Sequence, residues 1–164
     1  MRELLPEAEG QKRLLIDTNL LVLYVVGTVN ANRVSQFKRT QAYTVADYQL
    51  LYGVMQEFAE IWTVPQVMAE VSNLTDLSGH EYELARGVLR RSILEIVESQ
   101  VSSRVAAGHA LFAPLGITDA AIASAAKETG CAVLTDDLEL FLRLLAADVQ
   151  AFNFTHLREK FQIV

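Results

Sequence analysis

RLLIDTN, residues 13–19, is the most informative run of this chain. Residues 14–16 are consistent with a short buried strand, and the apolar residues 20–26 that follow are long enough for a helix. Asp17 therefore lies where a strand gives way to a helix. A carboxylate directly after three apolar residues is expected to be partly buried, where an unpaired charge is costly. Asp17 is thus either a metal ligand or the former of a hydrogen-bonded turn.

The same alternation of short apolar runs and helix-length segments continues along the chain. Further strands are predicted over residues 61–64, 132–135 and 149–154. Helices are predicted from residue 47 onward and over residues 65–77, 81–98, 116–129, 138–147 and 156–161. Strands separated by helices indicate βαβ units, and therefore a parallel sheet with helices on both faces. Ligands of such sheets bind beyond the carboxyl ends of the strands.

Local signals set several helix boundaries. Thr44-x-x-Asp47 can form a capping box, Pro65 suits the first turn of a helix, and Gly130 is expected to end the helix before it. Apolar side chains of the helix over 81–98 are predicted to form a stripe that faces the core: Leu84, Val88, Leu89, Ile93, Ile96 and Val97.

Composition predicts one compact domain over residues 1–164, because 51% of the residues are hydrophobic and 21% are charged. A more polar stretch at about 27–46 indicates an irregular or partly helical insertion in this domain. No apolar run reaches the roughly 18 residues of a membrane span, and the N-terminus is charged and lacks a secretory core. We therefore expect a cytoplasmic protein with no membrane partner. Cys131, the single cysteine, is expected to be buried and inert.

The net charge of −6 has the wrong sign for a protein that holds nucleic acid on a broad basic face. A function on nucleic acid would therefore need metal ions or a local basic patch. Arg33, Lys38 and Arg39 form the best candidate patch for RNA. They lie close in sequence to Phe37 and Tyr43, and basic groups beside exposed rings can combine phosphate contact with base stacking.

Acidic residues recur at four separated places, and most follow a predicted strand: Asp17, Glu70, Asp119 and the pair Asp136/Asp137. In one parallel sheet these carboxylates would converge at the same edge. Oxygen-only ligands suit Mg²⁺ or Mn²⁺, and the chain has neither a Cys pair nor a His-x-x-x-His set to favour zinc.

Each acid also has a purely structural interpretation. Asp119 is favoured in the first turn of a helix by the helix dipole, and Asp136 or Asp137 could only begin the helix that follows. Glu70 could be an exposed polar position on an amphipathic helix. The order of the acids along the chain is what favours a shared site.

Four segments resemble the successive motifs of PIN-domain nucleases, and together they span nearly the whole chain. These segments are residues 15–19, 64–71, 116–122 and 134–140. The resemblance implies a three-layer, Rossmann-like α/β/α sandwich with a central parallel sheet. It also implies Mg²⁺- or Mn²⁺-dependent cleavage of RNA, as in the VapC-type toxins and the ribosomal-RNA-processing nucleases of that family.

The resemblance also assigns roles to residues. Asp17, Glu70 and Asp119 match the first three acidic residues of the family, and Asp137 matches the fourth, with Asp136 as an alternative or supporting ligand. Asn19 and Thr135 match polar positions that orient the acidic centre. The segment between Asn19 and Glu70 is longer than in the compact toxins, so this resemblance leaves substrate and partner open.

Two classes of function follow. The first is a metal-dependent endoribonuclease, acting either as a toxin, which would require an antitoxin protein, or as a housekeeping RNA-processing enzyme. The second is a catalytically silent domain that acts by binding, which the intact acidic set disfavours. A response-regulator receiver is disfavoured because its acidic pair would follow the first strand. A homodimer is expected by analogy with similar domains.

Overall fold

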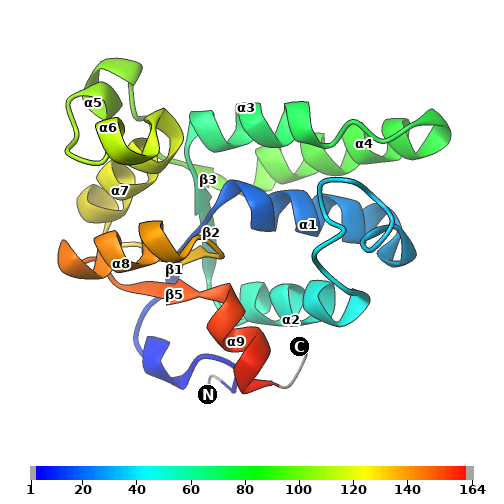
Figure 1. The fold of residues 1–164 in the computed structure, drawn as a ribbon, viewed down its shortest axis with the longest axis horizontal. Helices are drawn as coiled ribbons and strands as arrows, with labels where there is room; N and C mark the ends of the chain where they lie inside the picture. Colours follow the sequence, from blue (N-terminus) through cyan, green and yellow to red (C-terminus); the bar gives the residue numbers. More distant parts are fainter. Residues whose placement is uncertain (1–2, 162–164) are drawn as a thin grey trace.

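The structure is a computed structural model that describes residues 3–161, and its centre is a five-stranded sheet (Figure 1). The strand order is β3-β2-β1-β4-β5, and every neighbouring pair is parallel. The strands are β1 (Arg13–Ile16), β2 (Glu60–Thr63), β3 (Val97–Glu98), β4 (Ala132–Thr135) and β5 (Ala151–Asn153). The predicted parallel sheet is therefore confirmed.

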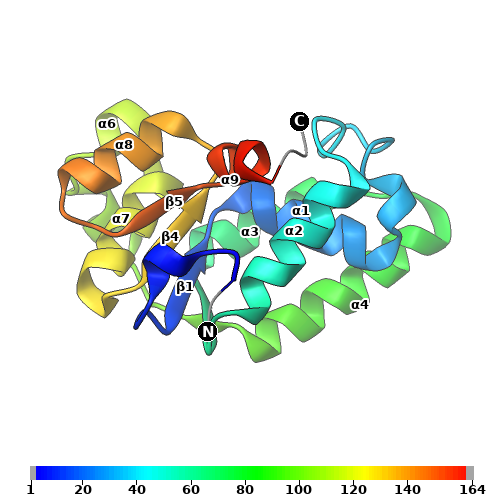
Figure 2. The same cartoon turned by 90° about the horizontal axis from the view of Figure 1, so that it is seen from below.

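Helices pack on both faces of this sheet, which makes the fold a three-layer α/β/α sandwich (Figures 1 and 2). The α-helices are α1 (Thr18–Val29), α2 (Val45–Gln56), α3 (Pro65–Leu74), α4 (Gly79–Glu95), α5 (Ser103–Ala107), α6 (Phe112–Leu115), α7 (Ile117–Thr129), α8 (Leu138–Ala146) and α9 (Phe154–Lys160). Two short 3₁₀ helices, η1 (Pro6–Ala8) and η2 (Ala31–Arg33), complete the description.

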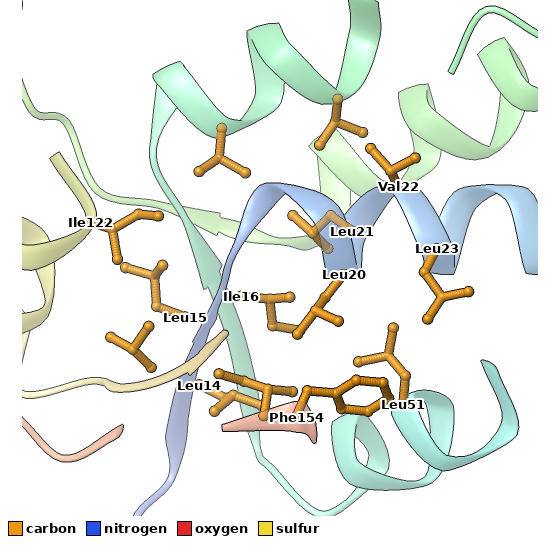
Figure 3. Packing of buried hydrophobic residues seen from close by; sticks show 14 of the residues in the cluster. Leu14, Leu15, Ile16, Leu20, Leu21, Val22, Leu23, Leu51, Ile122 and Phe154 are labelled. Atoms are coloured by element: carbon orange, nitrogen blue, oxygen red, sulfur yellow. The ribbon is translucent and has the colours of Figure 1, made fainter. Parts of the chain in front are cut away.

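Strand β1 is buried on both of its faces, as the central strand of such a sandwich must be. Its residues Leu14, Leu15 and Ile16 have no exposed surface. Figure 3 shows Leu15 directed toward Ile122 of α7, whereas Leu14 and Ile16 lie among the side chains that include Phe154. Because successive side chains of a strand point to opposite faces, three consecutive apolar residues fill both layers.

The predicted helix boundaries are largely confirmed. Thr44 and Asp47 form both halves of the capping box of α2, and Pro65 is the first residue of α3. Gly130 ends α7 in the left-handed conformation with φ 72°, where a residue with a side chain would be strained. Cys131 is buried and forms no disulfide, and burial raises the pKa of its thiol.

The predicted helix over 81–98 is wrong at its end and in its exposure. Helix α4 stops at Glu95, and Val97 and Glu98 form β3 instead, because their backbone pairs with Trp62 and Thr63 of β2. On the predicted stripe Val88 and Leu89 are buried. Leu84, Ile93 and Val97 are exposed by 43%, 49% and 38% of their surface.

The polar stretch at about 27–46 begins with the last turn of α1 and ends in the first turn of α2. Between them lie η2 and a series of turns. Two ion pairs tie these turns to the α3–α4 region: Arg33 to Glu81 at 2.8 Å and Lys38 to Asp76 at 3.0 Å. No helix within residues 3–161 is long and apolar enough to cross a membrane.

Candidate functional site

The site begins where the central strands β1 and β4 end side by side. Ile16 pairs with Leu134, so the residues that follow these strands are neighbours in space. The Thr135 hydroxyl donates to Oδ2 of Asp17 at 2.6 Å, and the Thr18 amide donates to Oδ1 at 2.7 Å. Both oxygens of this buried carboxylate are therefore fixed.

Glu70 is held by two threonines that neighbour the other acids in sequence. The Thr18 hydroxyl donates to Oε2 of Glu70 at 3.0 Å, and the Thr118 hydroxyl donates to Oε1 at 2.5 Å. Since Thr18 begins α1 and Thr118 lies in the first turn of α7, these bonds join three helices at the cavity. This role of the two threonines was not predicted from the sequence, although Thr18 directly follows Asp17 and Thr118 directly precedes Asp119.

The acidic pair after β4 is divided between two environments. Asp137 caps α8, because its Oδ1 accepts from the amide of Leu140 at 3.0 Å, and its own amide donates to the Thr135 hydroxyl at 3.0 Å. Asp136 instead accepts a hydrogen bond from the hydroxyl of Tyr43. The two consecutive acids thus point to different neighbours.

One cavity of about 280 Å³ lies at the carboxyl end of the sheet. It is lined by Asp17, Thr18, Asn19, Glu70, Leu115, Gly116, Ile117, Thr118, Asp119 and Asp137. Four of the five acids named from the sequence therefore share a cavity, together with Asn19. Asp136 lies outside this set of lining residues, and Thr135 lies behind it, bonded to Asp17.

The family model of the PIN domain matches residues 14–144. This chain belongs to the PIN domain family. A solved structure of a domain of a functionally unknown protein from Methanocaldococcus jannaschii DSM 2661 is similar to it, with 20% sequence identity and a TM-score of 0.47. That alignment covers 87% of this chain and 90% of the other. A comparison with curated proteins finds no match.

PIN domains are in general nucleases that use divalent metals, and in this PIN domain two cavity carboxyls, Asp17 and Asp119, have raised pKa values. Burial raises the pKa of Asp17 to about 6, against the opposing effect of the hydrogen bonds from Thr135 and Thr18. Burial also raises the pKa of Asp119 to about 7, and the negative charges of Asp17, Asp137 and Glu70 add to that effect. The cavity therefore disfavours the ionised forms of Asp17 and Asp119.

The donor set of the PIN domain cavity fits a hard divalent cation, because carboxylate and hydroxyl oxygens are the ligands that Mg²⁺ and Mn²⁺ prefer. Among residues 3–161, however, no three His, Cys, Asp or Glu side chains are already gathered closely enough to hold an ion. Threonine hydroxyls already donate hydrogen bonds to oxygens of Asp17 and Glu70, and repulsion between the negative charges keeps the carboxylates apart. Side-chain rearrangement would therefore accompany metal binding.

The basic patch expected for RNA is arranged differently from the prediction. Phe37 and Tyr43 are buried, with 6% and 7% of their surface exposed, so neither ring is available for base stacking. They contribute apolar area that seals the turns onto the core. Arg33 and Lys38 are engaged in ion pairs, while Arg39 is exposed.

Proposed function

We propose that this PIN domain is an Mg²⁺- or Mn²⁺-dependent endoribonuclease that hydrolyses RNA phosphodiester bonds at the acidic cavity. One observation carries the proposal: Asp17, Glu70, Asp119 and Asp137 come from four separate regions of the sequence and line one cavity. Membership of a nuclease family supports the same reaction class.

In this proposal the four carboxylates would hold the metal, and hydrogen bonds position three of them. Asp17 is fixed by Thr18 and Thr135, and Glu70 is oriented by two threonine hydroxyls. Asp137 is held by the first turn of α8. A divalent ion held by these carboxylates would supply an activated water and neutralise charge on the phosphoryl oxygens.

Asp119 has a distinct part in this proposal because of its proton. With a pKa raised to about 7, its carboxyl can hold a proton in the metal-free cavity and release it when a cation compensates the neighbouring charges. Asn19 lies at the rim as a neutral polar group that can orient substrate or ligand. No side chain of the cavity is required as a nucleophile.

The proposed nuclease could serve as a toxin or as a housekeeping RNA-processing enzyme. A VapC-type toxin would need an antitoxin, commonly encoded beside it, whereas a housekeeping RNA-processing enzyme would lack such a neighbour. The proposed unit is a single domain over residues 1–164, with Arg33, Lys38 and Arg39 on the turns at about 27–46 as RNA contacts. Pairing as a homodimer is proposed by analogy alone.

Cleavage of a mixed panel of structured and single-stranded RNAs tests the activity, with Mn²⁺, Mg²⁺ or EDTA present. The wild-type chain should cleave only with metal, and Asp119→Asn should lower the rate by about a hundredfold or more, because it removes a charged ligand. The matched control is Asp148→Asn, which alters an exposed acid at an asparagine-tolerant position with φ 57°. Circular dichroism checks that both variants fold.

Two results would contradict the nuclease proposal. One is equal cleavage by the wild-type chain and Asp119→Asn, and the other is cleavage that EDTA leaves unchanged. Metal binding without cleavage of any RNA or DNA would favour the catalytically silent binding domain instead.

A further inference from the structure

Tyr43 is joined to the acidic turn after β4 although it lies 93 residues from Asp136 in sequence. We propose that Tyr43 is a positioning residue of the metal site: by bonding Asp136 it fixes the β4–α8 turn that presents Asp137 to the cavity. This inference rests on the proposed function, since it concerns the same metal site. It assigns a role to a residue of the turns that precede α2.

The ring of Tyr43 is held in place by its neighbours, independently of the bond from its hydroxyl to Asp136. It packs edge-on against Phe154, with ring centroids 6.3 Å apart, and the guanidinium carbon of Arg158 lies 5.6 Å from its centroid. Arg158 is fixed in turn by Asp47, with 2.6 Å between Nε and Oδ1. Because the ring is buried among these groups, the direction of the hydroxyl is set by packing.

Asp136 depends on that hydroxyl. Its Oδ2 accepts from Tyr43, while its Oδ1 is buried and has no hydrogen-bond partner in the part of the chain that the structure describes. A buried carboxylate oxygen without a donor is costly. Without the Tyr43 hydroxyl, Asp136 would have to turn toward water or toward the cavity, where Asp17 already carries charge.

A displacement of Asp136 would reach the metal site through its neighbours on both sides. Thr135 donates to Asp17 and accepts from the amide of Asp137, and Asp137 caps α8. The turn is therefore held at Thr135 by its bonds to Asp17 and Asp137, and at Asp136 by the bond from Tyr43. Tyr43 thereby keeps Asp136 out of the cavity and leaves Asp137 as the acid that lines it.

Mn²⁺ titration calorimetry on the full chain tests this role, with the midpoint of thermal unfolding measured in parallel. Tyr43→Phe should weaken Mn²⁺ binding about tenfold, the effect typical of losing a group that orients a metal ligand. Tyr52→Phe, the same change on an exposed tyrosine of α2, should leave the affinity unchanged. Asp136→Ala should itself weaken binding, and adding Tyr43→Phe to it should change the affinity by less than about twofold.

The outcomes separate this inference from the nuclease proposal. A Tyr43→Phe variant that unfolds earlier but binds Mn²⁺ like the wild-type chain would show a purely structural role and overturn the inference alone. The inference would also be overturned if Tyr43→Phe still weakened Mn²⁺ binding about tenfold when added to Asp136→Ala. If Tyr43→Phe does not fold, an Asp136→Ala variant that binds Mn²⁺ as tightly as the wild-type chain would overturn the inference instead. A wild-type chain that binds neither Mn²⁺ nor Mg²⁺ overturns both proposals.

Discussion

Asp17 is the most enclosed of the four cavity carboxylates, with 6% of its surface exposed. Burial penalises the charged form, which is why its pKa rises even though two donors stabilise the carboxylate. Asp119 is less enclosed, yet burial raises its pKa to about 7, and the charges of four acidic neighbours, Asp17, Asp137, Glu70 and Glu139, add to that effect. The metal-free cavity is therefore a source of instability at neutral pH.

The first prediction concerns the pH dependence of stability in EDTA. The folded chain binds the Asp17 proton more tightly than the unfolded chain, so this group's stabilising contribution is complete below about pH 4 and is lost as the pH rises through about 6. Asp17→Asn should flatten that decline. At pH 7.5 the variant should be more stable than the wild-type chain by about 2 kcal/mol.

Urea unfolding at several pH values between 4 and 8 measures this difference. Asparagine can keep the hydrogen bond from Thr18, and the Thr135 hydroxyl can rotate to accept from the amide, so the fold should survive. Parallel stability curves for the two proteins would contradict the assignment of the decline to Asp17.

At the scale of elements, α2 and α9 are joined by a buried ion pair. Asp47 has a fully buried side chain that completes the capping box of α2 and accepts from Arg158 of α9 with both oxygens, at 2.6 and 3.1 Å. The Arg158 side chain is itself only 18% exposed. This pair fixes the C-terminal helix beside the turns that carry Tyr43.

The second prediction is that Arg158→Ala destabilises the chain by about 3 kcal/mol or more, because it leaves a buried carboxylate without its cation. Arg143→Ala is the matched control: it breaks an exposed pair with Glu139 one turn away on α8, and should cost about 0.5 kcal/mol or less. Chemical unfolding compares the two variants. Equal losses would show that burial does not decide the value of these pairs.

The apolar pattern of α4 shows the limit of reading elements from periodicity. Spacing correctly placed Val88 and Leu89 in the core, but Leu84 and Ile93 of the same predicted stripe are exposed, by 43% and 49%. Periodicity tells which residues share a face of a helix, but only the packing of other elements decides which faces are covered. Likewise, β3 is just Val97–Glu98, and its identity as a strand comes from pairing with β2.

At the scale of the whole molecule, the parallel sheet gathers negative charge at one edge. The chain already carries a net charge of −6, and four acids line one cavity of about 280 Å³. Under the proposed function, a divalent cation would relieve this repulsion in the folded state only. Folding and metal binding should therefore be coupled.

The third prediction is that Mn²⁺ at about a hundred times its dissociation constant raises the midpoint of thermal unfolding by about 5–10 °C, since such an excess stabilises by about 2.7 kcal/mol. Asp119→Asn should lose most of this rise, whereas Asp148→Asn should keep it. Differential scanning calorimetry at pH 7.5 measures the shift. The same rise in Asp119→Asn would place Mn²⁺ outside the cavity.

Local sequence was sufficient for much of this architecture. The apolar run before Asp17, the capping box at Thr44 and Asp47, Pro65 and Gly130 act through neighbours in the chain, and the structure has the elements they predicted. The alternation of strands and helices determined a parallel sheet, and strands of a parallel sheet end at a common edge. The sequence alone therefore predicted that the acids would lie together at one edge of the sheet, but not which side chains would hold them there.

Only the tertiary structure decided how the acids are held. Thr18 and Thr118 reach Glu70 across 52 and 48 residues, and Thr135 reaches Asp17 across 118. Tyr43, predicted as an exposed ring, is buried and meets Asp136 across 93 residues. Such contacts leave no periodic trace in the sequence, because they depend on which distant elements the packing of the sheet and helices brings together.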